Sequence, residues 1–177
     1  MARLIHLSDL HFGAHDDRLV DWLGKHLPPD SGRSSVVHGD FRCDNMICDS
    51  SEPRVAAVLD WELSTLGDAA SDFTYHLLMY RMPSTLFAGL AGVELEPLGI
   101  PSEDDYVAAY CRRTGRDHLP DKDYLVVFNL FRLAAILHGI RGRIARGTAS
   151  SAHAVETANK LEPLAELAWA QARQARL

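Results

Sequence analysis

The chain has 177 residues, enough for one domain with a hydrophobic core, and it is 47% hydrophobic and 24% charged, as globular proteins are. Its net charge of -6 argues against binding nucleic acid, which requires a basic surface. No run predicts a membrane span, and Asp9 and His11 interrupt the first apolar stretch, so neither a membrane nor an export signal is expected. Three cysteines in such a chain predict reduced thiols and a cytoplasmic protein.

The first part of the chain is predicted to form short strands around one helix, and the rest to form helices. The strands are expected at 3–7, 35–37, 46–48 and 54–59, with a helix over 17–27 that two prolines end. After residue 59 the pattern predicts only helices, at 68–81, 102–115, 121–146 and 151–176. Within the last of these, Pro163 marks a kink or a restart.

The helix over 121–146 is predicted to lie at the centre of the core. Its apolar residues alternate spacings of four and three and so share one stripe, which Phe128 and Phe131 widen. Trp61 is also expected to be a core residue rather than a ligand platform. The fold class that follows is α+β and mainly helical, with a short β-hairpin.

Three polar residues at predicted strand ends suit phosphoryl transfer. Such a reaction needs a carboxylate that orients the attacking hydroxyl and accepts its proton, and oxygen ligands that hold Mg²⁺ against the phosphates. Asp40 follows one strand, Asn45 lies five residues later, and Asp60 ends the next hairpin. A single Asp in a loop is more often a turn residue, but three matched positions at this spacing favour a site.

At these residues the sequence resembles a known family. His38-Gly39-Asp40, then Asn45, then Leu59-Asp60-Trp61-Glu62 are similar to the catalytic loop and metal motif of aminoglycoside phosphotransferases and choline kinases, which are related in fold to protein kinases. The resemblance implies that Asp40 is the catalytic base and that Asn45 and Asp60 hold Mg²⁺. It also implies that His38 braces the catalytic loop and that Asp72 anchors it by hydrogen bonds.

The resemblance covers residues 18–177 and narrows to one subgroup, the phosphotransferase-like domain found beside acyl-CoA dehydrogenases. The segments that carry it are 52–55, 59–68, 129–132 and 147–149. It implies ATP- and Mg²⁺-dependent phosphorylation of a small hydroxylated molecule. The fold it implies is the C-terminal lobe of the protein-kinase-like fold.

Family members begin with a β-rich lobe of about a hundred residues that holds ATP. Here about 37 residues precede His38, and they contain a single lysine, Lys25. We therefore expect the N-terminal ATP lobe to be absent and the activity to be impaired or partner-dependent. We also expect an exposed apolar face around the hairpin, through which the chain forms a homodimer.

The first residues resemble a different family. Arg3 to Gly13 are similar to the start of a calcineurin-like metallophosphoesterase, so we treat residues 1–17 as a separate segment. That resemblance implies an alternative metal site of Asp9, His11 and Asp40 in a hydrolase. The family's Asn-His and His-x-His motifs do not occur. Two further interpretations are that Asp9 and His11 are ordinary loop residues and that the chain is a non-catalytic binding or scaffold module.

Overall fold

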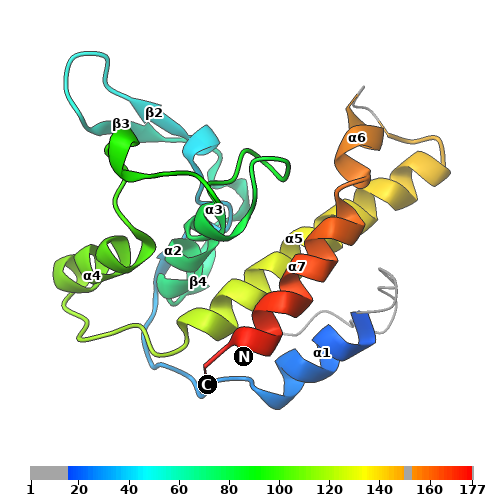
Figure 1. The fold of residues 1–177 in the computed structure, drawn as a ribbon, viewed down its shortest axis with the longest axis horizontal. Helices are drawn as coiled ribbons and strands as arrows, with labels where there is room; N and C mark the ends of the chain where they lie inside the picture. The colour runs from blue at the N-terminus through cyan, green and yellow to red at the C-terminus, as the bar shows by residue number, and fades with distance from the viewer. Residues whose placement is uncertain (1–15, 150–152, 177) are drawn as a thin grey trace.

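Helix α5, Lys122–Ala145, is the longest element of the computed structural model, which describes residues 16–149 and 153–176. On its predicted stripe Val126, Leu130, Leu133 and Leu137 are at most 8% exposed. Helix α7, Leu161–Gln174, lies along it, and α1, Asp16–Lys25, packs against both (Figure 1). The stripe therefore forms the centre of the core, as predicted.

Helix α5 is also long and apolar enough to cross a membrane, which its sequence pattern did not predict. Its most apolar 18-residue window has a mean hydropathy of 1.4, and half of that window is buried inside the protein. A helix that packs against other helices reaches such values because more than one of its faces contacts the core. The absence of a membrane partner stays a prediction.

Four short strands form two separate antiparallel pairs. The strands are β1, Ser35–Val37; β2, Met46–Cys48; β3, Val55–Val58; and β4, Thr65–Gly67. Strand β1 pairs with β4, and β2 pairs with β3 as a hairpin. The first three were predicted within one residue of their ends. The prediction that only helices follow residue 59 is wrong, because β4 and a 3₁₀ turn at Trp61–Leu63 come first. A strand of three residues has no readable periodicity, and only its pairing with β1 defines it.

The remaining helices lie close to their predicted positions. They are α2, Ala70–His76; α3, Leu78–Arg81; α4, Glu103–Thr114; and α6, Ala154–Ala158, with a 3₁₀ turn at Glu96–Leu98. The Ser102 hydroxyl accepts the backbone N–H of Asp105 and so caps α4. The predicted restart in the last helical region is the gap between α6 and α7. Pro163 stands in the first turn of α7, where its missing N–H costs no helical bond.

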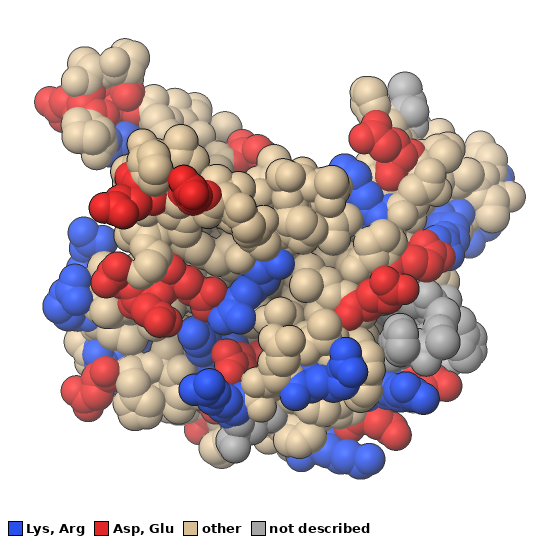
Figure 2. Space-filling view, in the orientation of Figure 1, with Lys and Arg blue, Asp and Glu red and all other residues tan. Residues whose placement is uncertain are grey.

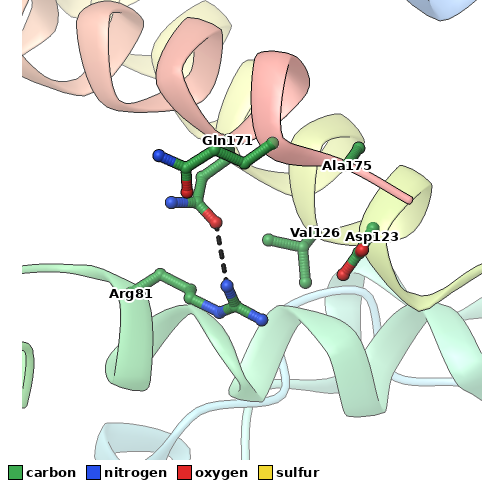
Figure 3. A pocket seen from close by; sticks show the side chains of 6 residues that line it. Arg81, Asp123, Val126, Gln171 and Ala175 are labelled. Carbon is green, nitrogen blue, oxygen red and sulfur yellow. Dashed lines mark hydrogen bonds between the residues drawn. The ribbon is translucent and has the colours of Figure 1, made fainter.

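Side chains from four helices meet around Arg81 of α3. Its guanidinium donates to the Gln171 side chain of α7 at 3.0 Å (Figure 3). It also donates to Glu103 of α4 at 2.6 Å. Lys122 of α5 donates to the same Glu103 carboxylate at 3.2 Å. The adjoining pocket, which Asp123 lines, holds about 20 Å³, so it has room for little more than a water molecule. This is a structural joint rather than a ligand site.

Candidate functional site

The loop His38–Asp40 follows β1 and is held by a carboxylate from α2. The backbone N–H of His38 donates to Oδ2 of Asp72 at 2.5 Å, and the N–H of Gly39 donates to Oδ1 at 2.9 Å. Both carboxylate oxygens are therefore occupied by the loop. Charge-assisted bonds of this kind are stronger than neutral ones, so the start of the loop is fixed to the helical body.

His38 is 1% exposed and uses both ring nitrogens within the protein. Its Nε2 donates to the Leu59 carbonyl at 2.6 Å, and its Nδ1 accepts the backbone N–H of Asp40 at 3.2 Å. These partners assign the tautomer with hydrogen on Nε2, because a ring nitrogen that accepts an N–H carries no hydrogen. His38 thus links the loop to the end of β3.

Asn45 lies in the 3₁₀ turn Cys43–Asn45 and faces Asp40. Its amide nitrogen donates to the Asp40 backbone carbonyl at 2.9 Å and to the Asp40 carboxylate at 3.1 Å. The structure therefore brings these two predicted site residues together. Because the amide nitrogen donates to Asp40, the amide oxygen of Asn45 is the atom that can coordinate a cation.

Asp60 is placed by the residue before it. The Leu59 N–H donates to the Asn45 carbonyl at 2.8 Å, while the Leu59 carbonyl accepts the His38 ring. Asp60 itself is exposed and takes the left-handed conformation, with φ 65°. Only a few per cent of residues other than glycine do so, although aspartate is enriched among them. The loop and the hairpin end are thus bonded together one residue before the predicted second metal ligand.

Gly39 is required by the shape of the loop. Its φ is +86°, and an added Cβ would lie 2.6 Å from the backbone carbonyl oxygen of Leu63. A side chain at this position is therefore excluded both by the backbone conformation and by the 3₁₀ turn that passes beside it. Steric constraints alone, independent of any catalysis, therefore require a glycine in the His-Gly-Asp motif.

A pocket of about 340 Å³ opens beside the loop and is lined mainly by apolar side chains. Tyr75 and His76 of α2 stand in its wall. Burial lowers the pKa of His76, while a hydrogen bond to the Phe41 backbone opposes the change. Burial, and then the charge of Asp40 and hydrogen bonding with it, raise the pKa of Tyr75. The wall of the pocket is therefore next to the predicted base. Its other lining residues are Arg42, Cys43, Asp44, Leu78, Met79, Met82, Phe87, Ala88 and Leu133.

The sequence pattern assigned no role to Tyr75 or Arg132, although both contact this region. Nη2 of Arg132 donates to the Gly39 carbonyl at 2.5 Å, and its guanidinium carbon lies 4.6 Å from the centre of the Tyr75 ring. The available signal was on α5, where Asn129 and Arg132 stand one turn apart within an otherwise apolar stripe. Polar side chains at such positions need buried partners.

Two expectations about single residues have different outcomes. Trp61 was expected in the core, but it is 48% exposed, because it lies in the 3₁₀ turn beside the hairpin with its ring against His38. Asp9 and His11 lie outside the described residues. Within the described part of the chain, no group of three or more His, Cys, Asp or Glu side chains is arranged to hold a metal ion. The alternative metal site with Asp40 stays a prediction.

The surface has two features that bear on partners. On the face in Figure 2, basic and acidic side chains are intermixed rather than gathered by sign. Exposed apolar side chains cluster on and around the four strands. The most exposed of them are Val36 and Leu66, which face each other across β1 and β4. The absence of nucleic acid, the homodimer and the cytoplasmic location stay predictions.

Comparison with known proteins gives three kinds of match. A family model for the phosphotransferase enzyme family matches residues 1–125. Acyl-CoA dehydrogenase family member 10 of Mus musculus is 43% identical over 155 residues, which are 86% of this chain and 14% of that protein. Family member 11 of Homo sapiens is 38% identical over 159 residues, 86% of this chain and 20% of that protein.

A solved structure is also similar. It is the crystal structure of a protein from Ralstonia eutropha that carries the name aminoglycoside phosphotransferase, with 45% identity and a TM-score of 0.84. The match covers 91% of this chain and 49% of the other. The chain thus spans about half of that structure and at most about a fifth of the two dehydrogenase relatives.

Proposed function

The chain belongs to the phosphotransferase enzyme family. We propose that it supplies the catalytic base and the metal ligands for an ATP-dependent phosphoryl transfer to a small hydroxylated molecule. The resemblance to this family, and to the domain found with acyl-CoA dehydrogenases, is confirmed. The helix-rich body with small sheets matches a kinase-like aminoglycoside phosphotransferase fold. That the chain corresponds to the C-terminal lobe is part of the proposal.

One observation carries the proposal. The Asn45 amide bonds the Asp40 carboxylate, and Leu59 bonds both Asn45 and His38, so the three motif positions converge at one end of the hairpin. A carboxylate, an amide oxygen and a second carboxylate are the groups that phosphoryl transfer requires there.

Each residue has a distinct proposed role. Asp40 orients the acceptor hydroxyl and takes its proton as the oxygen attacks the γ-phosphorus of ATP, while the bond from that phosphorus to the leaving ADP breaks. Asn45 and Asp60 supply oxygen ligands. This sparse set fits Mg²⁺, which keeps water and phosphate oxygens as its other ligands. Magnesium, when bound, neutralises the charge that develops on the phosphates.

The pocket beside the loop is the proposed place for the acceptor. Its volume of about 340 Å³ suits a small molecule, and Tyr75 in its wall lies next to Asp40. The residues assigned here would contact metal, phosphoryl group and acceptor rather than the purine. The proposal therefore includes the expectation that nucleotide binding by this chain is impaired or depends on a partner segment.

Calorimetric titration with ATP in excess Mg²⁺ tests the proposal. We expect saturable binding that Asp60→Asn weakens at least tenfold, because the variant loses an anionic metal ligand. Glu52→Gln is the matched control, since Glu52 is an exposed acid in the turn of the same hairpin that pairs with Arg54 and does not line the pocket. Absence of heat in the wild type would rule out binding by this chain alone and leave the partner-dependent form of the proposal. Equal binding by both variants would overturn the assignment of Asp60.

The two other function classes have no supporting contact among the described residues, and each keeps its own test. Mn²⁺-dependent cleavage of an aryl phosphate that His11→Ala abolishes would favour the hydrolase. Partner binding that survives Asp40→Asn and Asp60→Asn would favour a scaffold module.

A further inference from the structure

Arg132 reaches from the central helix to the peptide bond that carries the proposed base. Its Nη2 donates to the Gly39 carbonyl at 2.5 Å. That carbonyl belongs to the same planar peptide group as the N–H of Asp40, which donates to Nδ1 of His38 at 3.2 Å. Arg132 and His38 therefore hold opposite ends of one peptide plane. The orientation of this plane sets the direction in which the Asp40 side chain leaves the backbone.

The guanidinium of Arg132 is itself held in place. Its central carbon lies 4.6 Å from the centre of the Tyr75 ring, and Tyr75 is 7% exposed. One turn earlier on α5, Asn129 donates to the Ser71 carbonyl and to the Thr74 hydroxyl, both at 3.1 Å. These contacts fix α5 against α2 at the level of the loop and hold the Arg132 guanidinium over the Tyr75 ring.

Arg132 is a costly residue for stability alone. Its Nε is buried and has no hydrogen-bond partner within the part of the chain that the structure describes. A buried cation with an unpaired N–H often stabilises a fold no better than an apolar side chain of similar volume. The Nε atoms of Arg81 and Arg116 are also buried without a partner, so the case for Arg132 rests on what its Nη2 binds, the peptide of the proposed base.

We propose that Arg132, whose guanidinium lies over the Tyr75 ring, is a positioning residue. It fixes the Gly39–Asp40 peptide plane and thereby orients the Asp40 carboxylate toward the acceptor. This inference rests on the proposed function. Among the described residues, Arg132 makes no hydrogen bond to Asn45 or Asp60, so its loss acts on the metal ligands only indirectly, through the bonds of Asn45 to Asp40. Misplacing a catalytic group by about 1 Å can cost about a hundredfold in rate. The expected effect therefore falls on kcat rather than on the KM for Mg-ATP.

Three variants of the full chain test this. Arg132→Met removes both the bond and the charge, and Arg132→Lys keeps a cation that can donate to Gly39 but cannot stack as a plane. Arg141→Met is the control, because Arg141 lies on the same helix and pairs with Glu162 at the surface. The probe reaction is Mg-ATP hydrolysis with water as acceptor, giving ADP and phosphate. Carbon-13 and nitrogen-15 NMR of Gly39 and Asp40 is the second readout.

For Arg132→Met we expect kcat to fall about tenfold to a hundredfold, with KM for Mg-ATP within about twofold of wild type. Arg132→Lys should recover part of the rate, and Arg141→Met should keep it. The Gly39 carbonyl shift and the Asp40 amide exchange rate should change most in Arg132→Met, less in Arg132→Lys and not in Arg141→Met. Arg132→Lys serves both readouts if the methionine variant does not fold.

Two results would overturn the inference. One is an equal loss of kcat in Arg132→Met and Arg141→Met. The other is an unchanged Gly39 carbonyl and Asp40 amide when Arg132 is replaced. A wild type that hydrolyses no more ATP than Asp40→Asn would count against the proposed function instead, and the NMR comparison would then decide the positioning claim by itself.

Discussion

The carboxylate of Asp72 accepts the backbone N–H of Gly39 at 2.9 Å, across 33 positions of sequence. The second oxygen of the same carboxylate accepts the N–H of His38 at 2.5 Å. One side chain from α2 therefore satisfies two consecutive N–H groups that the turn leaves without strand partners. A buried N–H without a partner is expensive, so the loop depends on this carboxylate.

Asp72→Asn should destabilise the protein. Asparagine offers one acceptor oxygen and no charge, so one of the two N–H groups loses its partner. Hydrogen bonds to charged groups contribute about 1.5–3 kcal/mol, and the free energy of unfolding should fall by about that amount. Urea denaturation measures it. Asp104→Asn, in the first turn of α4, is the control and should stay within about 0.5 kcal/mol of wild type. A loss no larger than the control's would contradict the anchoring role.

Gly39→Ala should disrupt the loop more than glycine replacement at another left-handed position. Gly39 has φ +86° and a carbonyl oxygen 2.6 Å from the site of the new Cβ, whereas Gly32 has φ +65° and nothing within 4 Å. Gly32→Ala should cost about 1–2 kcal/mol, the conformational term alone. Gly39→Ala should cost more because the clash with Leu63 adds to it. Equal losses in thermal or urea unfolding would show that the loop relaxes freely around the added methyl group.

The sequence was most informative where local patterns decide structure. The stripe on α5, the serine cap of α4 and the turn-bounded strands each follow from neighbouring residues, and so do Asp40 and Asn45 through their motif. Strand β4 and the contact of Arg132 with Gly39 depend on residues far apart in the chain. No spacing rule reveals a pairing between residues 39 and 132, so only the folded arrangement of α5 against α2 could show it.

The protein should lose stability at acidic pH through Asp68. Burial raises the pKa of this carboxyl, but hydrogen bonds from the Ala70 N–H, Arg116 and Ser31 outweigh burial, and the folded-state pKa lies below 3.8. A lowered carboxyl pKa stabilises the fold above the unfolded value, and this stabilisation is lost as the pH falls through the folded value. Asp68→Asn should therefore be less stable than wild type at pH 7, by about 1–3 kcal/mol. The difference should shrink as the pH falls below about 3.8.

Unfolding by urea across this pH range measures the difference, with Glu162→Gln as the control. Glu162 also has a lowered pKa, through a hydrogen bond from Arg141, but both side chains are largely exposed. An exposed pair of this kind contributes little, so the control should differ from wild type by less than about 1 kcal/mol. A pH-independent loss in Asp68→Asn would assign its effect to packing rather than to charge.

The exposed pair Val36 and Leu66 predicts self-association through the strands. They face each other across β1 and β4 and are 63% and 74% exposed, so both present apolar surface to water on one face of the ladder. A second copy that covers this face would remove that surface from water.

Light scattering should then give about twice the 19.6 kDa of the chain. Val36→Thr combined with Leu66→Thr should shift the mass toward the monomer, because threonine keeps strand propensity but lowers the gain from burial. Leu98→Thr, at a leucine that is 61% exposed on the separate 3₁₀ turn, should leave the mass unchanged. A wild type that runs as a monomer at every concentration tested would refute the homodimer.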